Sequence, residues 1–274
     1  MMRTVSEIGT RLIRACVSSA GRLLAAALLL PVCACLPGAA GAAQTARLSA
    51  ALTPERLGAG TTIAFGFTVA STTGQVPSPL IGVDLLYPAN LGIGTSGLGL
   101  ATCDAQTLEV LGPEGCPSES QMGYGAALVE VPFGPVTLQE TAITKVFMAH
   151  IRDGHLGLIF YASGVVPVDA QIIFPGLVLP ARNPYGGDLA TTIPLVPTLP
   201  GAPYASVVKL STTLGPAHLT YYERTHGKYI PYHPRGIVLP RTCPRGGFKF
   251  AARFNFHDAT HAAARTSVPC PRRG

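Results

Sequence analysis

The chain contains no tryptophan, and only 12% of its 274 residues are charged. Tryptophan has the largest flat apolar side chain, so its absence weakens a carbohydrate-binding interpretation, although nine tyrosines remain. The phosphate-binding pattern G-x-x-x-x-G-K-[ST] is also missing. No spacing of acidic residues singles out a carboxylate pair of the kind that glycosidases use. We expect no cofactor, and we expect no nucleic-acid partner.

The apolar run Leu23–Leu36 is short for a membrane span, because it has 14 residues and contains Pro31. A spanning helix needs about 20 apolar residues. Positive charges before this run and small residues after it are typical of a secretory signal peptide. We predict a signal peptide at residues 1–43, with a cleavage sequence at Ala40–Ala42 or Gly41–Ala43. The positive charges are Arg3, Arg11, Arg14 and Arg22.

Two alternatives remain open for this N-terminal segment. An uncleaved membrane anchor becomes long enough if Pro37–Ala43 is counted with the apolar run. The second alternative is a lipid anchor, because Cys33 and Cys35 lie near the end of the apolar run. The residues before these cysteines fit a lipidation sequence poorly. We predict a secreted or cell-envelope protein that meets a membrane only through an uncleaved N-terminal segment.

Charge is distributed unevenly along the predicted mature chain. Residues 43–221 hold six basic residues (Lys and Arg) and eleven acidic residues (Asp and Glu). Residues 222–274 hold ten basic residues and two acidic ones. A basic C-terminal part can meet anionic polymers or anionic lipid. We favour a solvated face that offsets the acidic part of the same domain, because the basic residues are spread among apolar strand positions.

Three of the seven cysteines fall within the predicted signal peptide, which leaves four in the mature chain. An even number of cysteines in an exported chain indicates disulfides. Four cysteines allow three pairings. We predict Cys103–Cys116 and Cys243–Cys270, because each pair is close in sequence and is bracketed by turn residues.

A zinc site is the alternative for the second pair. Its ligands would be Cys243, His257, His261 and Cys270. Neither cysteine belongs to a C-x2-C pair, and the segment between them has the pattern of a strand rather than a helix. Oxidising compartments also favour disulfides over thiolate sites. We therefore expect no metal.

Alternation of apolar residues with small or polar ones predicts strands. Residues Ile63–Val69 alternate with a period of two, and similar runs recur between turns rich in Gly and Pro, which make up 56 residues of the chain. This pattern predicts an all-β fold, an antiparallel β-sandwich. The other predicted strands are Arg47–Leu52, Leu80–Leu86, Ala126–Val131, Thr141–His150, His155–Ser163, Gln171–Val178, Leu189–Val196, Ala205–Thr212 and Phe248–Phe256.

One short helix is predicted at Asp104–Leu111, with Asp104 as its cap and Gly112-Pro113 ending it. No linker or fixed-period repeat divides the rest of the chain. We predict a single disulfide-stapled domain over residues 44–274. The alternative is two halves that meet near Pro132–Pro135.

No nucleophile motif is complete. The segment Gly94-Thr95-Ser96-Gly97 has Leu98 where the motif G-x-S-x-G requires glycine. Residues Ser206–Lys209 match S-x-x-K, but the valines between them predict a strand, where residues three apart face opposite sides. His150 and His155 flank a predicted Asp-Gly turn, and we favour two exposed polar residues there over an acid–base pair. We predict no catalytic residue.

The most distinctive candidate surface is the segment Tyr221–Pro234, in which tyrosines alternate with basic residues. Tyrosine gives rigid amphipathic contact area, and basic groups attract anions. The structural alternative is a hairpin that turns at His226-Gly227 and packs its tyrosines on one sheet face. The candidate binding residues are Tyr221, Tyr222, Arg224, Lys228, Tyr229 and Tyr232.

The order of several features resembles a group of uncharacterised exported β-sandwich proteins of soil actinobacteria. The resemblance rests on Cys103, on Cys116–Ser120 leading to Gly123, and on Cys243-Pro244 followed by Phe248-Lys249-Phe250 and Cys270. It implies the fold class and local disulfides, and it carries over no active site. The usual Asp-Gly turn before the last strand is replaced here by Asp258-Ala259.

Two function classes follow. We predict an exported structural or binding protein of the cell envelope or extracellular space, with an envelope polymer or another protein as its partner. The alternative is a secreted hydrolase whose site is assembled only in three dimensions.

Overall fold

The computed structural model describes residues 43–93, 101–166, 169–198, 201–216, 220–234 and 236–271. Residues 1–42 of the predicted signal peptide, with its alternative anchors, and the Gly94–Gly97 motif lie outside the described residues. The described residues belong to one compact unit. Within the described ranges, no helix combines the length and the apolar character that a membrane span requires.

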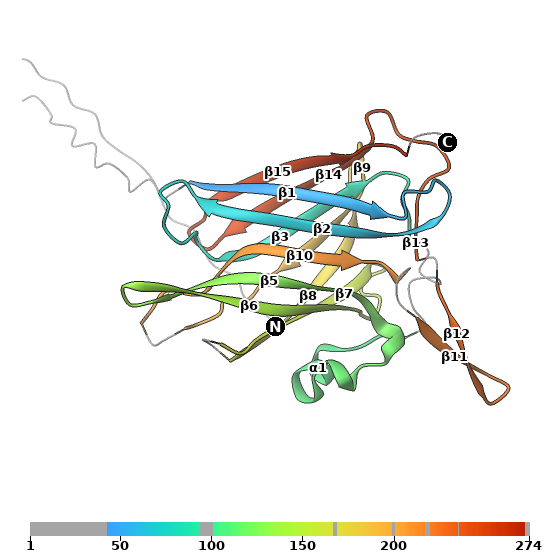
Figure 1. Cartoon of the computed structure of the whole chain (residues 1–274), viewed down its shortest axis with the longest axis horizontal. Coiled ribbons are helices and arrows are strands. Elements are labelled where there is room, and N and C mark those ends of the chain that lie inside the picture. The colour runs from blue at the N-terminus through green and yellow to red at the C-terminus, as the bar shows by residue number, and fades with distance from the viewer. Residues whose placement is uncertain are drawn as a thin grey trace, which may run out of the picture. The chain divides into compact units, whose positions relative to one another are not determined.

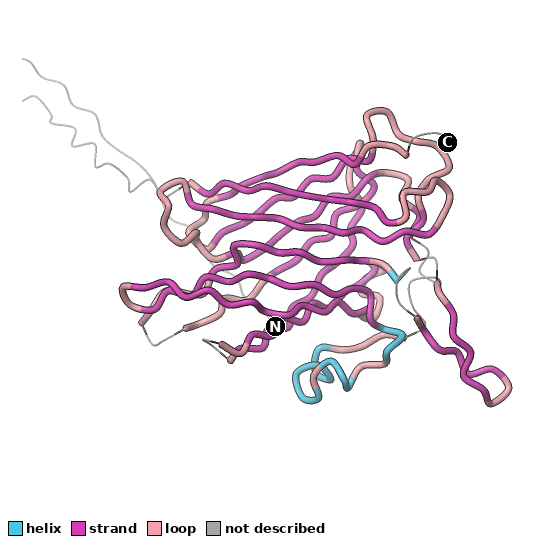
Figure 2. The backbone as a smooth tube through the Cα atoms, in the orientation of Figure 1, coloured by secondary structure: helices cyan, strands magenta, loops and turns pink. Residues whose placement is uncertain are grey.

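Strands make up most of the described chain, and most of the helical turns lie in one short stretch (Figure 2). The all-β prediction with one short α-helix is therefore confirmed. The strands are β1 (Gln44–Thr53), β2 (Gly60–Ser71), β3 (Leu80–Pro88), β4 (Gly92–Ile93), β5 (Gln121–Phe133), β6 (Val136–Met148), β7 (Leu156–Gly164), β8 (Ala170–Pro180), β9 (Tyr185–Thr192), β10 (Ser206–Leu214), β11 (Tyr221–Thr225), β12 (Lys228–Tyr232), β13 (Ile237–Val238), β14 (Phe248–Phe256) and β15 (His261–Val268).

Thirteen of these strands form one continuous sheet with antiparallel neighbours (Figure 1). Their order is β15-β14-β3-β9-β8-β7-β6-β5-β10-β2-β13-β4, and β1 pairs with the other edge of β2. Strand β1 also lies beside β15, so the sheet curves round until its two ends approach each other. Strands β11 and β12 form a separate hairpin that extends away from this sheet (Figure 1).

The curvature gives the sheet an inner face, on which the main apolar core lies. Alternate residues of β2, including Phe65 and Phe67, point inward as the period of two requires. Phe67 packs against Phe254 of the distant strand β14 at a ring-centroid separation of 5.0 Å. Burial of Phe254 is complete. Apolar burial across the sheet is the main favourable contribution to such a fold.

The helix α1 (Ala105–Leu111) covers part of the outer face. Asp104 caps it, accepting a hydrogen bond from the Thr107 backbone N–H at 2.8 Å. Gly112 ends it with a positive φ of 68°, and the 3₁₀ turns η2 (Pro113–Gly115) and η3 (Ser118–Ser120) follow. Leu108 is fully buried, and it belongs with Phe147 to a second, smaller apolar cluster.

Both predicted disulfides are present. Cys103–Cys116 closes the segment around α1, with the two Cα atoms 5.4 Å apart. Cys243–Cys270 ties the loop before β14 to the end of β15, with a Cα separation of 6.0 Å. The second bridge uses both thiols that the zinc alternative needs. Disulfides of this kind are typical of oxidising compartments.

The predicted elements differ from the observed ones mainly at strand ends. Strand β9 ends at Thr192, whereas the prediction extended it past Pro194, which has no N–H to continue a ladder. Strand β15 was missed, because most of its inward positions (Ala262, Ala264 and Thr266) hold small residues rather than large apolar ones. The segment Pro132–Pro135 lies at the turn between β5 and β6, which are neighbours in the same sheet.

Candidate functional site

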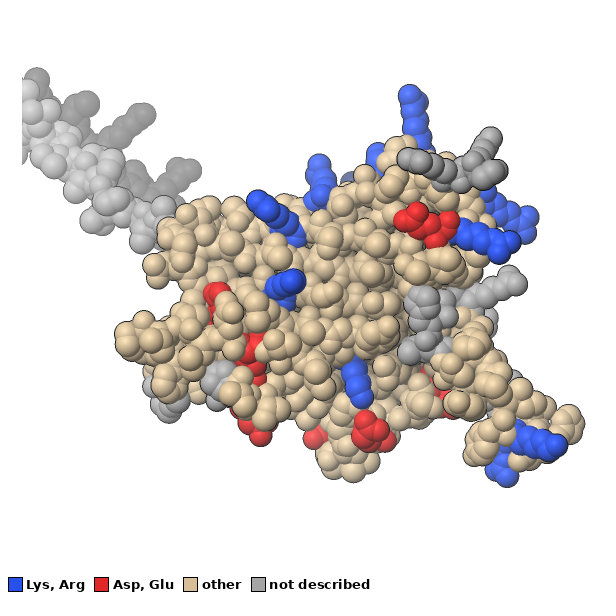
Figure 3. Space-filling model, in the orientation of Figure 1, with Lys and Arg blue, Asp and Glu red and all other residues tan. Residues whose placement is uncertain are grey.

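The predicted binding segment forms the β11–β12 hairpin, with Tyr221 opposite Tyr232 and Arg224 opposite Tyr229. His226 and Gly227 both have a positive φ and make its two-residue turn, as the structural alternative anticipated. Figure 3 shows Lys and Arg atoms at the end of this projection and over the strands at the opposite side of the sheet. Asp and Glu atoms in that view lie mainly over the β5–β6 side and α1.

The six predicted residues do not form a single patch. The register places Tyr222, Arg224 and Tyr229 on one exposed face of the hairpin. Lys228 lies on the opposite face, the face that also carries Tyr221 and Tyr232.

Tyr221 has a structural role instead of a place in an exposed surface. It is 1% exposed, and its hydroxyl donates a hydrogen bond of 2.6 Å to the backbone carbonyl of Gln121. Its ring packs against that of Tyr232 at 5.6 Å. Burial, followed by the proximity of Tyr232 and Glu119, raises the pKa of Tyr221 far above its ordinary value. The anchor fixes the hairpin to the start of β5.

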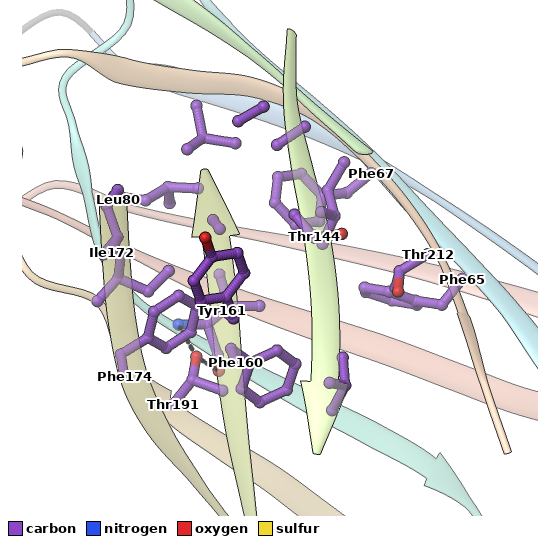
Figure 4. A pocket seen from close by; sticks show the side chains of 18 of the residues that line it. Phe65, Phe67, Leu80, Thr144, Phe160, Tyr161, Ile172, Phe174, Thr191 and Thr212 are labelled. Carbon is purple, nitrogen blue, oxygen red and sulfur yellow. Dashed lines mark hydrogen bonds between the residues drawn. The ribbon is translucent and has the colours of Figure 1, made fainter. Parts of the chain in front are cut away.

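The inner face of the large sheet encloses an apolar cavity of about 130 Å³. Its walls come from every strand from β5 to β10 and from β2 and β3. Figure 4 shows side chains of these strands converging on one space, with Phe160 and Phe174 on one side and Phe65 and Phe67 on the other. The Phe160 and Phe174 rings are stacked at 5.1 Å.

Two smaller spaces adjoin this cavity at opposite ends. One, of about 70 Å³, shares Leu85, Leu189 and Leu214 with it. The other, of about 50 Å³, shares Ala142 and Val207. The inward side chains of β6 run through all three spaces, from Glu140 to Met148. The inner face therefore encloses an elongated series of apolar spaces.

Few polar groups face this space, and they differ in their hydrogen bonding. The Thr191 hydroxyl donates to the Val83 carbonyl at 2.7 Å, and the Thr212 hydroxyl donates to the Tyr124 carbonyl at 3.2 Å. Thr144 Oγ1 is buried without a hydrogen-bond partner in the described part of the chain, and so is Glu140 Oε1. Such atoms are uncommon in native proteins and call for an explanation.

Three other acidic groups, Asp84, Glu114 and Asp188, have cationic partners. On the outer face, Arg253 makes ion pairs with Asp84, at 3.2 Å, and with Asp188. Burial raises the pKa of Asp188, Arg253 acts against that rise, and nearby Asp84 adds to it. Glu140 differs from these carboxyl groups, since no ion pair is found for it among the described residues.

The catalytic alternatives gain little from the geometry. A surface hollow of about 320 Å³ brings Asp104 and His150 to one place. The Asp104 carboxyl is engaged by Thr107, and the Thr102 hydroxyl lies 3.2 Å from His150 Nδ1 and 3.4 Å from Nε2. A hydroxyl nearly equidistant from both ring nitrogens is not aligned with the lone pair of either, as proton transfer would require.

The remaining sequence candidates lie in strands or turns. Residues Ser206–Lys209 belong to β10, with Ser206 buried and Lys209 exposed, so S-x-x-K does not form a helical pair. His155 pairs with Arg152 across a turn in which Asp153 and Gly154 have positive φ. Within the described residues, no group of three or more His, Cys, Asp or Glu side chains is placed to hold a metal.

Sequence reasoning missed the interior cavity and Glu140. A signal was present, because Glu140 lies in phase with Ala142, Thr144 and Val146 on alternate positions of one strand. Comparisons of the chain with protein-family models, curated proteins and solved structures give no match.

Proposed function

We propose that the mature chain is an exported, non-enzymatic binding protein of the cell envelope or extracellular space, which holds an apolar small molecule or hydrocarbon chain inside its large sheet. The cavity of about 130 Å³ with apolar walls carries this proposal. The export part is supported by the N-terminal sequence pattern and by the two disulfides. We also propose that the chain is a member of the exported actinobacterial group, because it has the sequence motifs around the four cysteines that resemble that group.

The size and chemistry of the cavity favour an apolar occupant over water. Packed interiors contain few voids larger than a water molecule. An apolar cavity on the order of 150 Å³ stays dry and binds benzene, because water finds no hydrogen-bond partners there. The cavity here has a similar volume and adjoins further apolar space. A flexible hydrocarbon chain suits such an elongated space.

The test is titration of the secreted mature protein with a fluorescent apolar dye and competition by n-octane derivatives. Ala142 is 8% exposed and lines two of the adjoining spaces, so Ala142→Leu should fill part of the interior and weaken dye binding. The matched control is Ala263→Leu, at an exposed position of β15, which should leave binding unchanged. Equal dye binding by the two variants would contradict an interior site.

The β11–β12 hairpin supports a second role, contact with an anionic envelope polymer or protein. Tyr222 and Tyr229 are 51% and 70% exposed, and they share a face with Arg224. Replacing Tyr222, Arg224 and Tyr229 together with alanine should abolish retention on anionic cell-wall polymer, because these three residues share one exposed face. The control is Tyr124→Ala, at an exposed tyrosine of β5. Unchanged retention of the triple variant would remove the hairpin from consideration.

A further inference from the structure

One end of the interior carries a buried carboxyl group. Glu140 lies on β6 and is 8% exposed, and its Oε1 has no hydrogen-bond partner within the described ranges. Gly164 leaves room for it, since a Cβ at that position would collide with Oε1. Burial of a polar group without a partner costs free energy. The fold therefore keeps an acceptor at this place that no other residue in the described part of the chain satisfies.

The Glu140 carboxyl group lines one of the inner apolar spaces and does not face bulk solvent. Glu140 lines the space of about 50 Å³ that shares Val129, Ala142 and Val207 with the main cavity. The same strand continues inward to Thr144 and Val146, which line the main cavity. A ligand whose hydrocarbon part fills the main cavity would bring its polar end to Glu140.

The surroundings of this end are acidic. An outer hollow of about 500 Å³ shares Ala170, Ile172 and Val196 with the space at Glu140. The hollow carries Glu109 and Asp169, and both residues are exposed. Among the described residues that line the hollow and the inner space, none is Lys, Arg or His. The local field therefore favours a cation over an anion.

We propose that Glu140 receives the protonated amine of an amphipathic ligand whose hydrocarbon part occupies the interior. This inference rests on the proposed apolar binding function and names the head group that the site selects. An ammonium group has three donors and no acceptor, so it matches an unpartnered carboxyl oxygen. Hydrogen bonds between charged groups are about twice as strong as those between neutral groups.

The other head groups fit this end less well. A carboxylate head would place a second acidic group beside Glu140, where like charges repel. An alcohol can donate one hydrogen bond to Oε1, but it gains nothing from the charges of Glu109 and Asp169. The site should therefore rank ligands of one chain length as amine above alcohol above carboxylate.

The experiment measures dissociation constants of n-octylamine, n-octanol and octanoate for the secreted mature protein and for Glu140→Gln. The wild type should bind octylamine about tenfold or more tightly than octanol, because hydrogen bonds to charged groups are the stronger ones. Glu140→Gln should lose this preference and keep its octanol affinity, which also shows that the variant is folded.

Two further variants separate position from charge. Glu130→Gln removes an acidic group on neighbouring β5, where Glu130 hydrogen-bonds to Gln139 on the exposed side, and the amine preference should persist. Gly164→Ala keeps the Glu140 charge but displaces its carboxyl, so the preference should fall. Equal affinity of the wild type for all three probes, or a preference for octanoate, would overturn the head-group inference alone. Failure of every probe to bind would overturn the proposed function itself.

Discussion

Glu140 and Thr144 lie four residues apart on the inward face of β6, and each holds a buried oxygen without a hydrogen-bond partner among the described residues. At about 3.3 Å per residue, roughly 13 Å of strand separates them. Both line the series of apolar spaces, Glu140 near one end and Thr144 in the main cavity. Strand β6 therefore presents two polar points to an otherwise apolar interior.

Replacing Thr144 with valine removes a buried hydroxyl while keeping the shape of the side chain. We expect Thr144→Val to raise the free energy of unfolding by about 1 kcal/mol, because an unsatisfied buried oxygen carries an uncompensated desolvation cost. Thr212→Val is the control, since its hydroxyl is hydrogen-bonded to the Tyr124 carbonyl, and it should lower the free energy by about 1 kcal/mol. Urea unfolding measures both. A loss of stability in Thr144→Val would show that its hydroxyl has a partner.

The turn between β14 and β15 holds Ala259 at a φ of 63°. An alanine in this region is strained by about 1–2 kcal/mol, whereas glycine is not, although glycine costs more chain entropy. We expect Ala259→Gly to raise the unfolding free energy by about 0.5–1 kcal/mol. In the reciprocal control, Gly154→Ala at a φ of 77° should lower the unfolding free energy. An added Cβ at this position meets no other atom within 4 Å, so backbone strain alone would cause the loss. Thermal unfolding of both variants checks the two signs.

The Cys243–Cys270 bridge closes a segment of 27 residues. Replacing both cysteines with alanine should lower the unfolding free energy by about 3.5 kcal/mol by the chain-entropy estimate. Denaturant unfolding of the double variant measures this loss. Intact mass of the secreted wild type, with and without reductant, should show a gain of two hydrogens for each of two bridges. Free thiols or bound zinc in the unreduced protein would contradict the pairing.

Asp104 links the stability of α1 to pH. The hydrogen bond from the Thr107 backbone N–H, followed by that from the Thr107 hydroxyl, holds the pKa of Asp104 below its ordinary value. A lowered folded-state pKa means that the charged form stabilises the fold above the unfolded pKa, and this contribution is lost as pH falls through the folded pKa. Between about pH 5 and pH 2 the wild type should therefore lose more stability than Asp104→Asn. If the unfolding free energies of the two proteins change with pH in parallel, the charge of Asp104 does not contribute to stability.

Local signals in the sequence were sufficient for much of the fold. The strand Phe248–Phe256 was predicted with its observed bounds, because large apolar residues alternate along it. The helix was predicted to within one residue from its Asp104 cap and Gly112 end. The turn at His226-Gly227 was anticipated as the structural alternative, since glycine adopts positive φ at low cost in a two-residue turn.

The candidate site required information that local patterns lack. The cavity depends on long-range pairing, such as Thr212 opposite both Phe65 and Gly125, which brings strands distant in sequence together. Glu140 lies in a polar stretch that resembles an exposed strand end. Its alternation with Ala142 and Thr144 indicates an inward position only once the register of β6 is known. The hairpin tyrosines were noticed, but the burial of Tyr221 follows from its contact with β5.

The most direct test of an interior apolar site is a crystal structure of the secreted mature protein grown with 1-bromooctane. The anomalous signal of bromine locates the probe without ambiguity. The proposed function predicts bromine inside the sheet, within the cavity lined by Ala142, Phe160 and Phe174. Bromine found only on the outer surface, with side chains filling the interior, would contradict it.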